Sequence, residues 1–153
     1  MGWDRGGDGA GGAGAGAGVA VYHAVSAAER AARAGVDVGV VDMHTLKPLD
    51  EAVVVRAIET TGRIVTAEDH SVLHGLGTAV AEVIAASGRG CALRKLGHSD
   101  RFAPMGIPED LVHAAGFDDD GILAAVLEMM GVEPVEDEDW GEEAGRGATT
   151  PRR

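Results

Sequence analysis

The sequence has few of the residues on which several classes of protein depend. Its single cysteine, Cys91, excludes an internal disulfide and suits a reducing compartment. Lysine and arginine total 13 against 25 acidic residues, and the net charge of −12 argues against nucleic-acid binding, which needs basic side chains. No apolar run approaches the ~20 residues that cross a bilayer, and no hydrophobic stretch near the start indicates a secretion signal. We expect a cytoplasmic protein that binds neither nucleic acid nor a membrane.

The two ends of the chain differ in composition from its middle. Residues 1–18 hold nine of the 24 glycines, and residues 132–153 hold seven acids against three arginines. Neither end repeats the large apolar residues that offset the entropy lost on ordering, so we expect a disordered head and a disordered acidic tail. One domain with a modest core is expected over residues 19–131.

The middle alternates between strand-like and helix-like segments. Continuous β-branched runs predict strands, and apolar residues at helical spacing between capping residues and glycines predict helices. The expected order is helix 26–35, strand 36–43, helix 47–62, strand 63–69, helix 78–88, strand 91–97, helix 108–116 and helix 118–131. This alternation predicts an α/β protein, a three-layer α/β/α sandwich around a mostly parallel sheet.

Three histidines could take part in chemistry. His70 and His74 have the spacing of zinc ligands on one face of a helix, but nearby glycines predict a turn, and we favour two polar turn residues. His44 stands at the carboxyl end of a strand, where open α/β sheets bind ligands. A catalytic role is open there, and a hydrogen bond to the following loop is the interpretation we favour.

A cluster of polar residues, Glu68, Asp69 and His70, ends the second predicted strand. Two acids beside an imidazole could act as acid–base groups. The alternative is that the acids cap the following turn and helix. We favour the capping role, because the sequence supplies no nucleophile beside them.

Two loops carry further candidates. Gly75 and Gly77 precede a predicted helix, as in phosphate-binding loops, but match neither the dinucleotide fingerprint nor the Walker A loop. We favour a tight turn that lets the helix pack close to the sheet. Asp100 and Phe102 follow the third predicted strand; a functional role is possible, and we expect Phe102 to anchor the loop by packing.

Three segments occur in order between about residues 24 and 130: VDMHTLKPLDEAVV, GRIVTAEDHSVLHGLGTAVAEVIA and LGHSDRFAPMGIPEDLVHAAGFDDDGIL. Together they resemble the C-terminal domain of transketolase-like thiamine enzymes, most closely split transketolases and deoxyxylulose-phosphate synthase. The positions that match the motifs of this family are His44, Lys47, Pro48, Glu68, Asp69, His70, Gly75, Gly77, Asp100 and Phe102. The glycine usual in the family before Gly75 is His74 here.

The resemblance implies that the reaction centre belongs to other domains. In the family, thiamine diphosphate and Mg²⁺ lie between two domains that this chain lacks, and the C-terminal domain has no agreed catalytic residue. We therefore expect no catalytic, cofactor-binding or metal-binding residue in this chain, and structural or interface roles for the motif positions. Thiamine diphosphate and Mg²⁺ are expected only in a complete assembly.

The segment before the first helix departs from the family pattern. Family members carry an apolar strand there, in the middle of the sheet, whereas residues 13–18 of this chain are only alanine and glycine. Each large-to-Ala loss in a core costs roughly 2–5 kcal/mol. We therefore expect residues 19–22 to take the strand position and the first helix to run from about Ser26 to Ala34.

The leading hypothesis is an accessory subunit of a thiamine-diphosphate-dependent ketol-transferring enzyme. Its partner would be a chain that supplies the thiamine-binding domains, or further copies of itself. The alternatives are a non-enzymatic interaction or regulatory module and a truncated remnant of such an enzyme. The substrate stays open, because the family selects it in the other domains.

Overall fold

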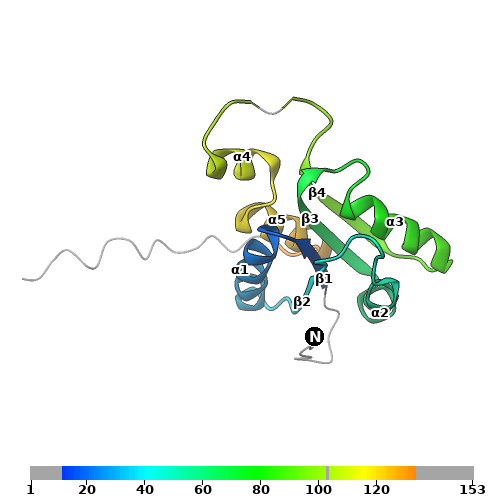
Figure 1. The fold of residues 1–153 in the computed structure, drawn as a ribbon. Helices are drawn as coiled ribbons and strands as arrows, with labels where there is room; N and C mark the ends of the chain where they lie inside the picture. Colours follow the sequence, from blue (N-terminus) through cyan, green and yellow to red (C-terminus); the bar gives the residue numbers. More distant parts are fainter. Residues whose placement is uncertain (1–11, 103, 134–153) are drawn as a thin grey trace, which may run out of the picture.

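The computed structural model describes residues 12–102 and 104–133 (Figure 1). The elements are β1 (Gly12–Ala17), α1 (Ala20–Arg33), β2 (Val38–Asp42), α2 (Glu51–Thr61), β3 (Arg63–Ser71), α3 (Leu76–Ser87), β4 (Ala92–His98), α4 (Pro108–Ala115) and α5 (Asp119–Met130). The expected alternation of strand and helix is confirmed from β2 onward. Residues 1–11 of the expected head and 134–153 of the expected tail lie outside the described residues.

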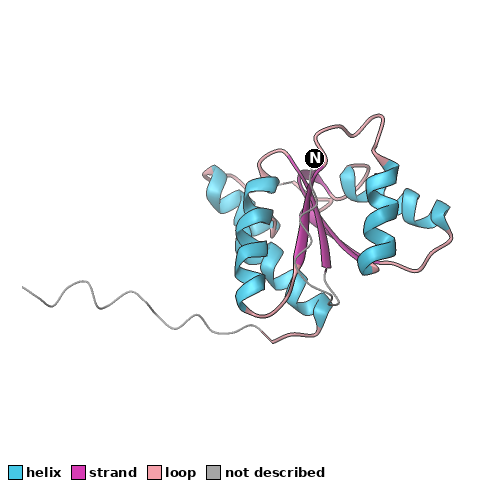
Figure 2. Cartoon of the chain, turned by 90° about the horizontal axis from the view of Figure 1, so that it is seen from below, coloured by secondary structure: helices cyan, strands magenta, loops and turns pink. Residues whose placement is uncertain are grey.

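The strands form one parallel sheet in the order β2–β1–β3–β4. Helices α1 and α5 pack together on one face, and α2 packs with α3 on the other. Figure 2 shows the helices on both sides of the sheet. A parallel sheet covered on both faces is the arrangement that the alternating pattern predicts, and the three-layer α/β/α sandwich is confirmed.

Each face of the sheet has its own apolar core. On the α1 and α5 side, Phe117 is fully buried among aliphatic residues, and the buried face of α1 consists of Ala20, Ala24, Ala27 and Ala31. On the α2 and α3 side, Ile64 packs with Leu76 and Val80, which are also inaccessible to solvent. Because alanine is small, α1 can lie close to the backbone of the sheet.

The first strand corrects an expectation. Residues Gly12–Ala17 form β1, which pairs in parallel with both β2 and β3, so the folded domain begins before residue 19. The segment 19–22, expected as the strand, instead begins α1, and Tyr22 is 75% exposed. The reason is that ladder hydrogen bonds come from the backbone, which glycine and alanine supply as well as larger residues. The sequence argument had weighed side-chain packing alone.

The helices begin and end where capping residues stand. Asp50 Oδ1 accepts a hydrogen bond from the backbone N–H of Val53 (3.2 Å) at the start of α2, as the sequence predicts. Asp118 Oδ1 does the same for Gly121 (2.8 Å) at the start of α5. Among the residues that the structure describes, no helix is long and apolar enough to cross a bilayer.

Candidate functional site

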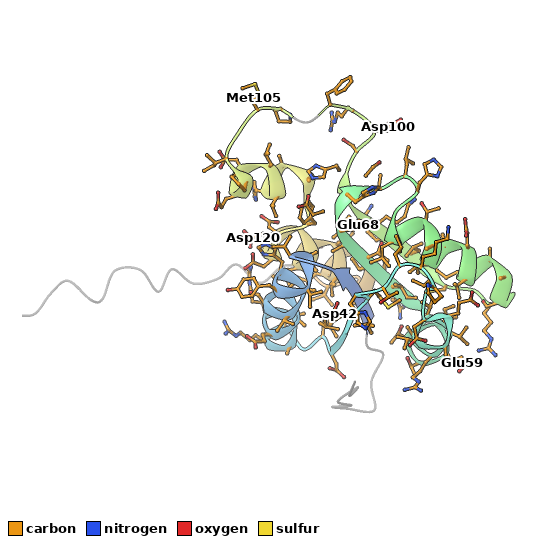
Figure 3. The ribbon with its side chains drawn as sticks, viewed as in Figure 1. Asp42, Glu59, Glu68, Asp100, Met105 and Asp120 are labelled. Atoms are coloured by element: carbon orange, nitrogen blue, oxygen red, sulfur yellow. The ribbon has the colours of Figure 1, made fainter. Side chains whose placement is uncertain are left out.

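The parallel sheet brings the sequence candidates to one edge. His44, Lys47 and Pro48 lie in the loop between β2 and α2, Glu68 ends the buried part of β3, and Asp100 lies in the loop after β4. Figure 3 labels Glu68 and Asp100 on this side of the molecule. Since the carboxyl ends of parallel strands meet at one edge, the topology puts these residues on one side of the molecule, with β1 and β3 between the loops after β2 and β4. We call this the carboxyl edge.

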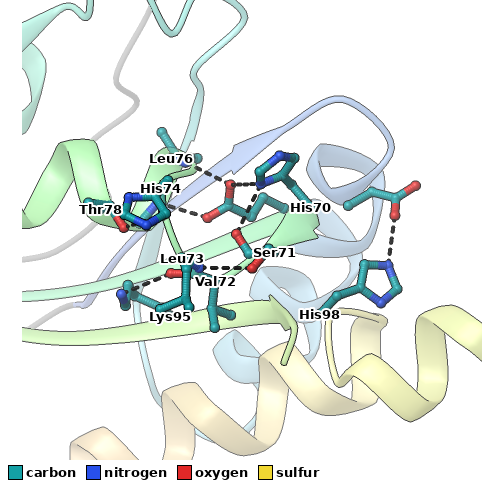
Figure 4. A network of polar contacts seen from close by, with 12 residues as sticks. His70, Ser71, Val72, Leu73, His74, Leu76, Thr78, Lys95 and His98 are labelled. Atoms are coloured by element: carbon teal, nitrogen blue, oxygen red, sulfur yellow. Dashed lines mark hydrogen bonds and ion pairs between the residues drawn. The ribbon is translucent and has the colours of Figure 1, made fainter. Parts of the chain in front are cut away.

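The carboxylate of Glu68 is bound by the first turn of α3. Oε2 accepts a hydrogen bond from the backbone N–H of Leu76 (2.7 Å), and Oε1 accepts one from that of Gly77 (2.8 Å). The side chain is buried, with 4% of the residue exposed. The N-cap position, Gly75, has no side chain for this task, so Glu68 satisfies two N–H groups of α3 from the neighbouring strand (Figure 4). This geometry supports the capping interpretation over acid–base chemistry.

The two turn glycines are required by close contacts. A Cβ on Gly75 would lie 2.0 Å from Glu68 Oε2. A Cβ on Gly77 would lie 2.5 Å from Lys95 Cδ and 2.8 Å from Thr66 Oγ1. All three distances are far below van der Waals contact, so these glycines allow α3 to approach the sheet, as the sequence interpretation proposed.

His74 occupies the left-handed position that a glycine usually fills. Its φ is +64°, and its backbone N–H donates to Thr78 Oγ1 at 3.0 Å. His70 lies at the end of β3, where its Nδ1 is 3.0 Å from the carbonyl oxygen of Ser71. The pair therefore sits on a strand end and a turn. Among the described residues, no three side chains of His, Cys, Asp or Glu come together as metal ligands.

Two residues that carried no sequence pattern take part in this network. His98 Nε2 lies 3.0 Å from Asp69 Oδ1, and the His98 ring makes a T-shaped contact with the buried Phe117 ring, with the ring centroids 5.5 Å apart. Lys95 Nζ donates to the carbonyl oxygen of Val72 at 2.9 Å (Figure 4). The roles of His98 and Lys95 follow from the pairing of β3 with β4, and a local sequence pattern does not encode that pairing.

Thr66, in the middle of β3, is fully buried. Its hydroxyl has no hydrogen-bond partner among the described residues. A Cβ on Gly77 would lie 2.8 Å from this hydroxyl, so Thr66 Oγ1 lies against the first turn of α3. It is a packing group of the α3 junction.

The loop after β2 forms one wall of a groove. His44 Nδ1 lies 2.6 Å from Thr45 Oγ1, in agreement with the expected hydrogen bond to the following loop. Lys47 and Glu51 face α3 across a groove of about 450 Å³, and Glu82 lines its other wall. Pro48 is exposed beside it. The groove presents Lys47 and the imidazole of His74 beside the acids Glu51 and Glu82, so it lacks the strongly basic surroundings that a phosphate group prefers.

The loop after β4 contradicts one expectation. Phe102 does not anchor the loop: its side chain is completely exposed. Arg101 bonds locally: its Nε donates to Ser99 Oγ at 2.8 Å. The loop that carries Asp100 and Met105 projects from the body of the domain (Figure 3). Phe102 lines a groove with Leu111 and Ala114 but is not covered by it.

Two titratable groups with shifted pKa values, His113 in α4 and Asp119 in α5, lie near the junction of these helices, away from the motif residues. Hydrogen bonding to Asp118 raises the pKa of His113 (2.6 Å). Burial raises the pKa of Asp119, but hydrogen bonds from its own backbone N–H, from Ser26 and from His23 outweigh burial and hold the pKa below its usual value. These contacts join α1 and α4 to α5. Burial also raises the pKa of the Cys91 thiol.

The architecture defines a class: an α/β domain with a four-stranded parallel sheet between two layers of helices. The family model described as "Transketolase, C-terminal domain" matches residues 15–138. The chain belongs to the transketolase C-terminal domain family, a family of thiamine-diphosphate enzymes.

Individual relatives agree with this assignment. The chain is 46% identical over 105 residues to 1-deoxy-D-xylulose-5-phosphate synthase of Thioalkalivibrio sulfidiphilus, covering 69% of this chain and 16% of the synthase. It is 36% identical over 110 residues to a putative transketolase C-terminal section of Methanocaldococcus jannaschii, covering 72% and 34%. A solved split-gene transketolase, described as an inactive β4 tetramer, superposes with a TM-score of 0.75 at 33% identity and covers 83% and 41%.

The lengths of these relatives matter. The chain spans about a sixth of the synthase and about a third of the split section. The alignments therefore concern one domain of larger proteins. The remaining 84% of the synthase and 66% of the split section lie outside the alignment with this chain.

Proposed function

We propose that this chain is an accessory subunit of a thiamine-diphosphate-dependent ketol-transferring enzyme and is not catalytic alone. The observation that carries the proposal is the Glu68 carboxylate. Both of its oxygens accept hydrogen bonds from α3, so the acid of the family motif is occupied by its own fold. The likeness to a split-gene transketolase supports a role as one section of a divided enzyme.

The residues present do not fit the cofactor. Thiamine diphosphate is held through a divalent ion and groups that neutralise its phosphates. The described residues bring together no three metal-ligating side chains, and the groove beside Lys47 also presents Glu51 and Glu82. In the proposed assembly a partner chain supplies the cofactor domains, and the cofactor supplies the carbanion chemistry. We expect this assembly to act in the cytoplasm.

Thermal unfolding tests the cofactor part of the proposal. The purified chain is heated with and without thiamine diphosphate and Mg²⁺, and its Tm is compared. A ligand that binds only the folded state raises the Tm, so we expect no change. A clear rise at low micromolar cofactor would overturn the proposal, because this chain would then hold the cofactor itself.

Affinity purification tests the partner part. The tagged chain is expressed in its own host, and the proteins that bind it are identified and then purified separately. We expect a partner with the two thiamine-binding domains, and ketol transfer only when both chains are present. A partner without those domains would support the non-enzymatic interaction module instead. An aggregated or molten chain that binds no partner would support the truncated remnant.

A further inference from the structure

Two grooves among the described residues differ in the charge of their linings. The groove beside Lys47 presents the acids Glu51 and Glu82. The second groove, of about 410 Å³, lies between α4 and the residues that follow β4, and we call it the α4 groove. Arg101 and His98 line it, and none of the described residues that line it is acidic. In a chain with a net charge of −12, such a lining is suited to an anion.

Arg101 carries the charge that an anion would contact. Its Nε donates to Ser99 Oγ at 2.8 Å, and no described residue accepts a hydrogen bond from its two Nη groups. A guanidinium presents paired N–H groups in a geometry that matches the two oxygens of a carboxylate. The neighbouring acid in the sequence, Asp100, does not line the groove. The Ser99 contact therefore restrains the side chain and leaves the Nη groups for a ligand.

His98 adds a second polar group, and its ring is fixed on two sides. Its Nε2 lies 3.0 Å from Asp69 Oδ1, and because a carboxylate only accepts, Nε2 carries the proton (Figure 4). The ring also packs against the buried Phe117 ring. No described residue bonds to Nδ1, which donates to an anion when the imidazole is protonated.

The rest of the α4 groove is apolar. Leu111, Ala114 and Ala115 line it from α4, and Phe102 lines it from the segment after β4. The volume of about 410 Å³ falls in the range of small-molecule sites. One guanidinium beside an apolar wall fits a ligand with a single carboxylate on a small apolar body. A diphosphate would need further cations or a metal ion, which the described lining does not supply.

We propose that the α4 groove binds a small organic acid, with its carboxylate on Arg101 and its apolar body against Leu111 and Ala114. The site differs from the Glu68 turn, whose carboxylate is already bound by α3. The inference goes beyond the proposed function and does not rest on it, because it concerns a ligand held by this chain alone. Failure of either leaves the other standing.

NMR titration of the full ¹⁵N-labelled chain tests the proposal, with benzoate as the probe. We expect saturable shifts at the backbone amides of Ser99, Ala114 and Ala115, with a Kd in roughly the millimolar range for so small a probe. Benzamide has the same ring without the charge and should bind at least about fivefold more weakly. The absence of saturable shifts up to about 20 mM benzoate would overturn the proposal, as would equal binding of benzamide.

Variants assign the contact to particular side chains. Arg101→Gln removes the guanidinium and should weaken benzoate binding by roughly five- to tenfold. Arg56→Gln is the matched control: it removes an exposed arginine from α2, outside the groove, and should leave the affinity unchanged. Ala114→Glu places a carboxylate in the groove and should also weaken binding.

Arg101 and Ala114 are exposed, so circular dichroism and the Tm of their variants should match those of the wild type. An unchanged benzoate affinity in Arg101→Gln would overturn the assignment of the carboxylate to this residue. Equal losses in Arg101→Gln and Arg56→Gln would overturn it as well, because they would show general attraction to positive charge rather than a site.

Discussion

The loops that follow β3 and β4 leave neighbouring strands and differ in how they are held. The Glu68 carboxylate holds the turn after β3 by accepting a hydrogen bond from the backbone N–H of Leu76. Gly75 and Gly77 in this segment have no room for a Cβ, and Lys95 Nζ donates to the carbonyl oxygen of Val72 in the turn. The loop after β4 leaves Phe102 and Met105 in solvent. Both loops contain family motif residues. The motif around Glu68 therefore stabilises the fold of the domain, whereas the motif around Phe102 is exposed to solvent.

The strongest challenge to this comparison is the removal of the Glu68 carboxylate. Glu68→Ala leaves the N–H groups of Leu76 and Gly77 without acceptors in a buried turn, and should lower the free energy of unfolding by about 3 kcal/mol. Urea unfolding measures the loss. Glu68→Gln keeps one acceptor oxygen and should lose less. A change near zero for the alanine variant would mean that the turn is not fixed by this side chain.

The second largest effect is expected at Gly75. The Cβ of Gly75→Ala would displace Glu68 Oε2, and the forced shift should cost about 2 kcal/mol. Gly90→Ala is the matched control, because its Cβ would meet nothing within 4 Å. The double variant Gly75→Ala, Glu68→Ala should cost less than the sum of the two single variants, because the clash disappears with the carboxylate. Additive costs would show that the two residues act independently.

A smaller effect of opposite sign is expected at His74. A non-glycine residue in the left-handed region is strained, so His74→Gly should raise the free energy of unfolding by about 0.5 kcal/mol after the flexibility of glycine in the unfolded chain is counted. Thermal and urea unfolding both measure it. A loss of stability would mean that the imidazole makes a contact worth more than the backbone strain.

The smallest effect concerns the helix that carries the exposed loop back to the domain. The pKa of His113 is raised above its unfolded value by hydrogen bonding to Asp118, so its contribution to stability is fully present below the unfolded pKa of 6.5. That contribution is lost as the pH rises through the higher folded pKa. The stability difference between wild type and His113→Gln should therefore shrink as the pH is raised. NMR titration should show the His113 pKa fall in Asp118→Asn.

Much of the fold follows from local pattern. Asp50 and the glycines that end the helices stand where the sequence predicts, because caps are encoded within a few residues. The capping role of Glu68 could also be predicted from the sequence, because the acid ends a strand just before a helix whose start carries no capping side chain, and no nucleophile stands beside it. These features depend on neighbours in sequence.

The remainder depends on contacts between distant segments. β1 has no hydrophobic period to detect, and its place is set by the backbones of β2 and β3. The contact of Asp69 with His98 depends on the register of β3 against β4, which shifts between Ala67 and Ser71. The exposure of Phe102 follows from the path of its loop, and an aromatic residue alone does not reveal that path.

The position of β1 has a consequence for the limits of the domain. In the described sheet, β2 pairs only with β1, so β1 is the sole link between β2 and the other strands. A chain shortened to begin at residue 19 would lose a strand and would also leave β2 with no strand to pair with. Composition suggests that the glycine-rich residues Gly12–Ala17 could be removed, yet they form the strand that joins β2 to β3 and β4.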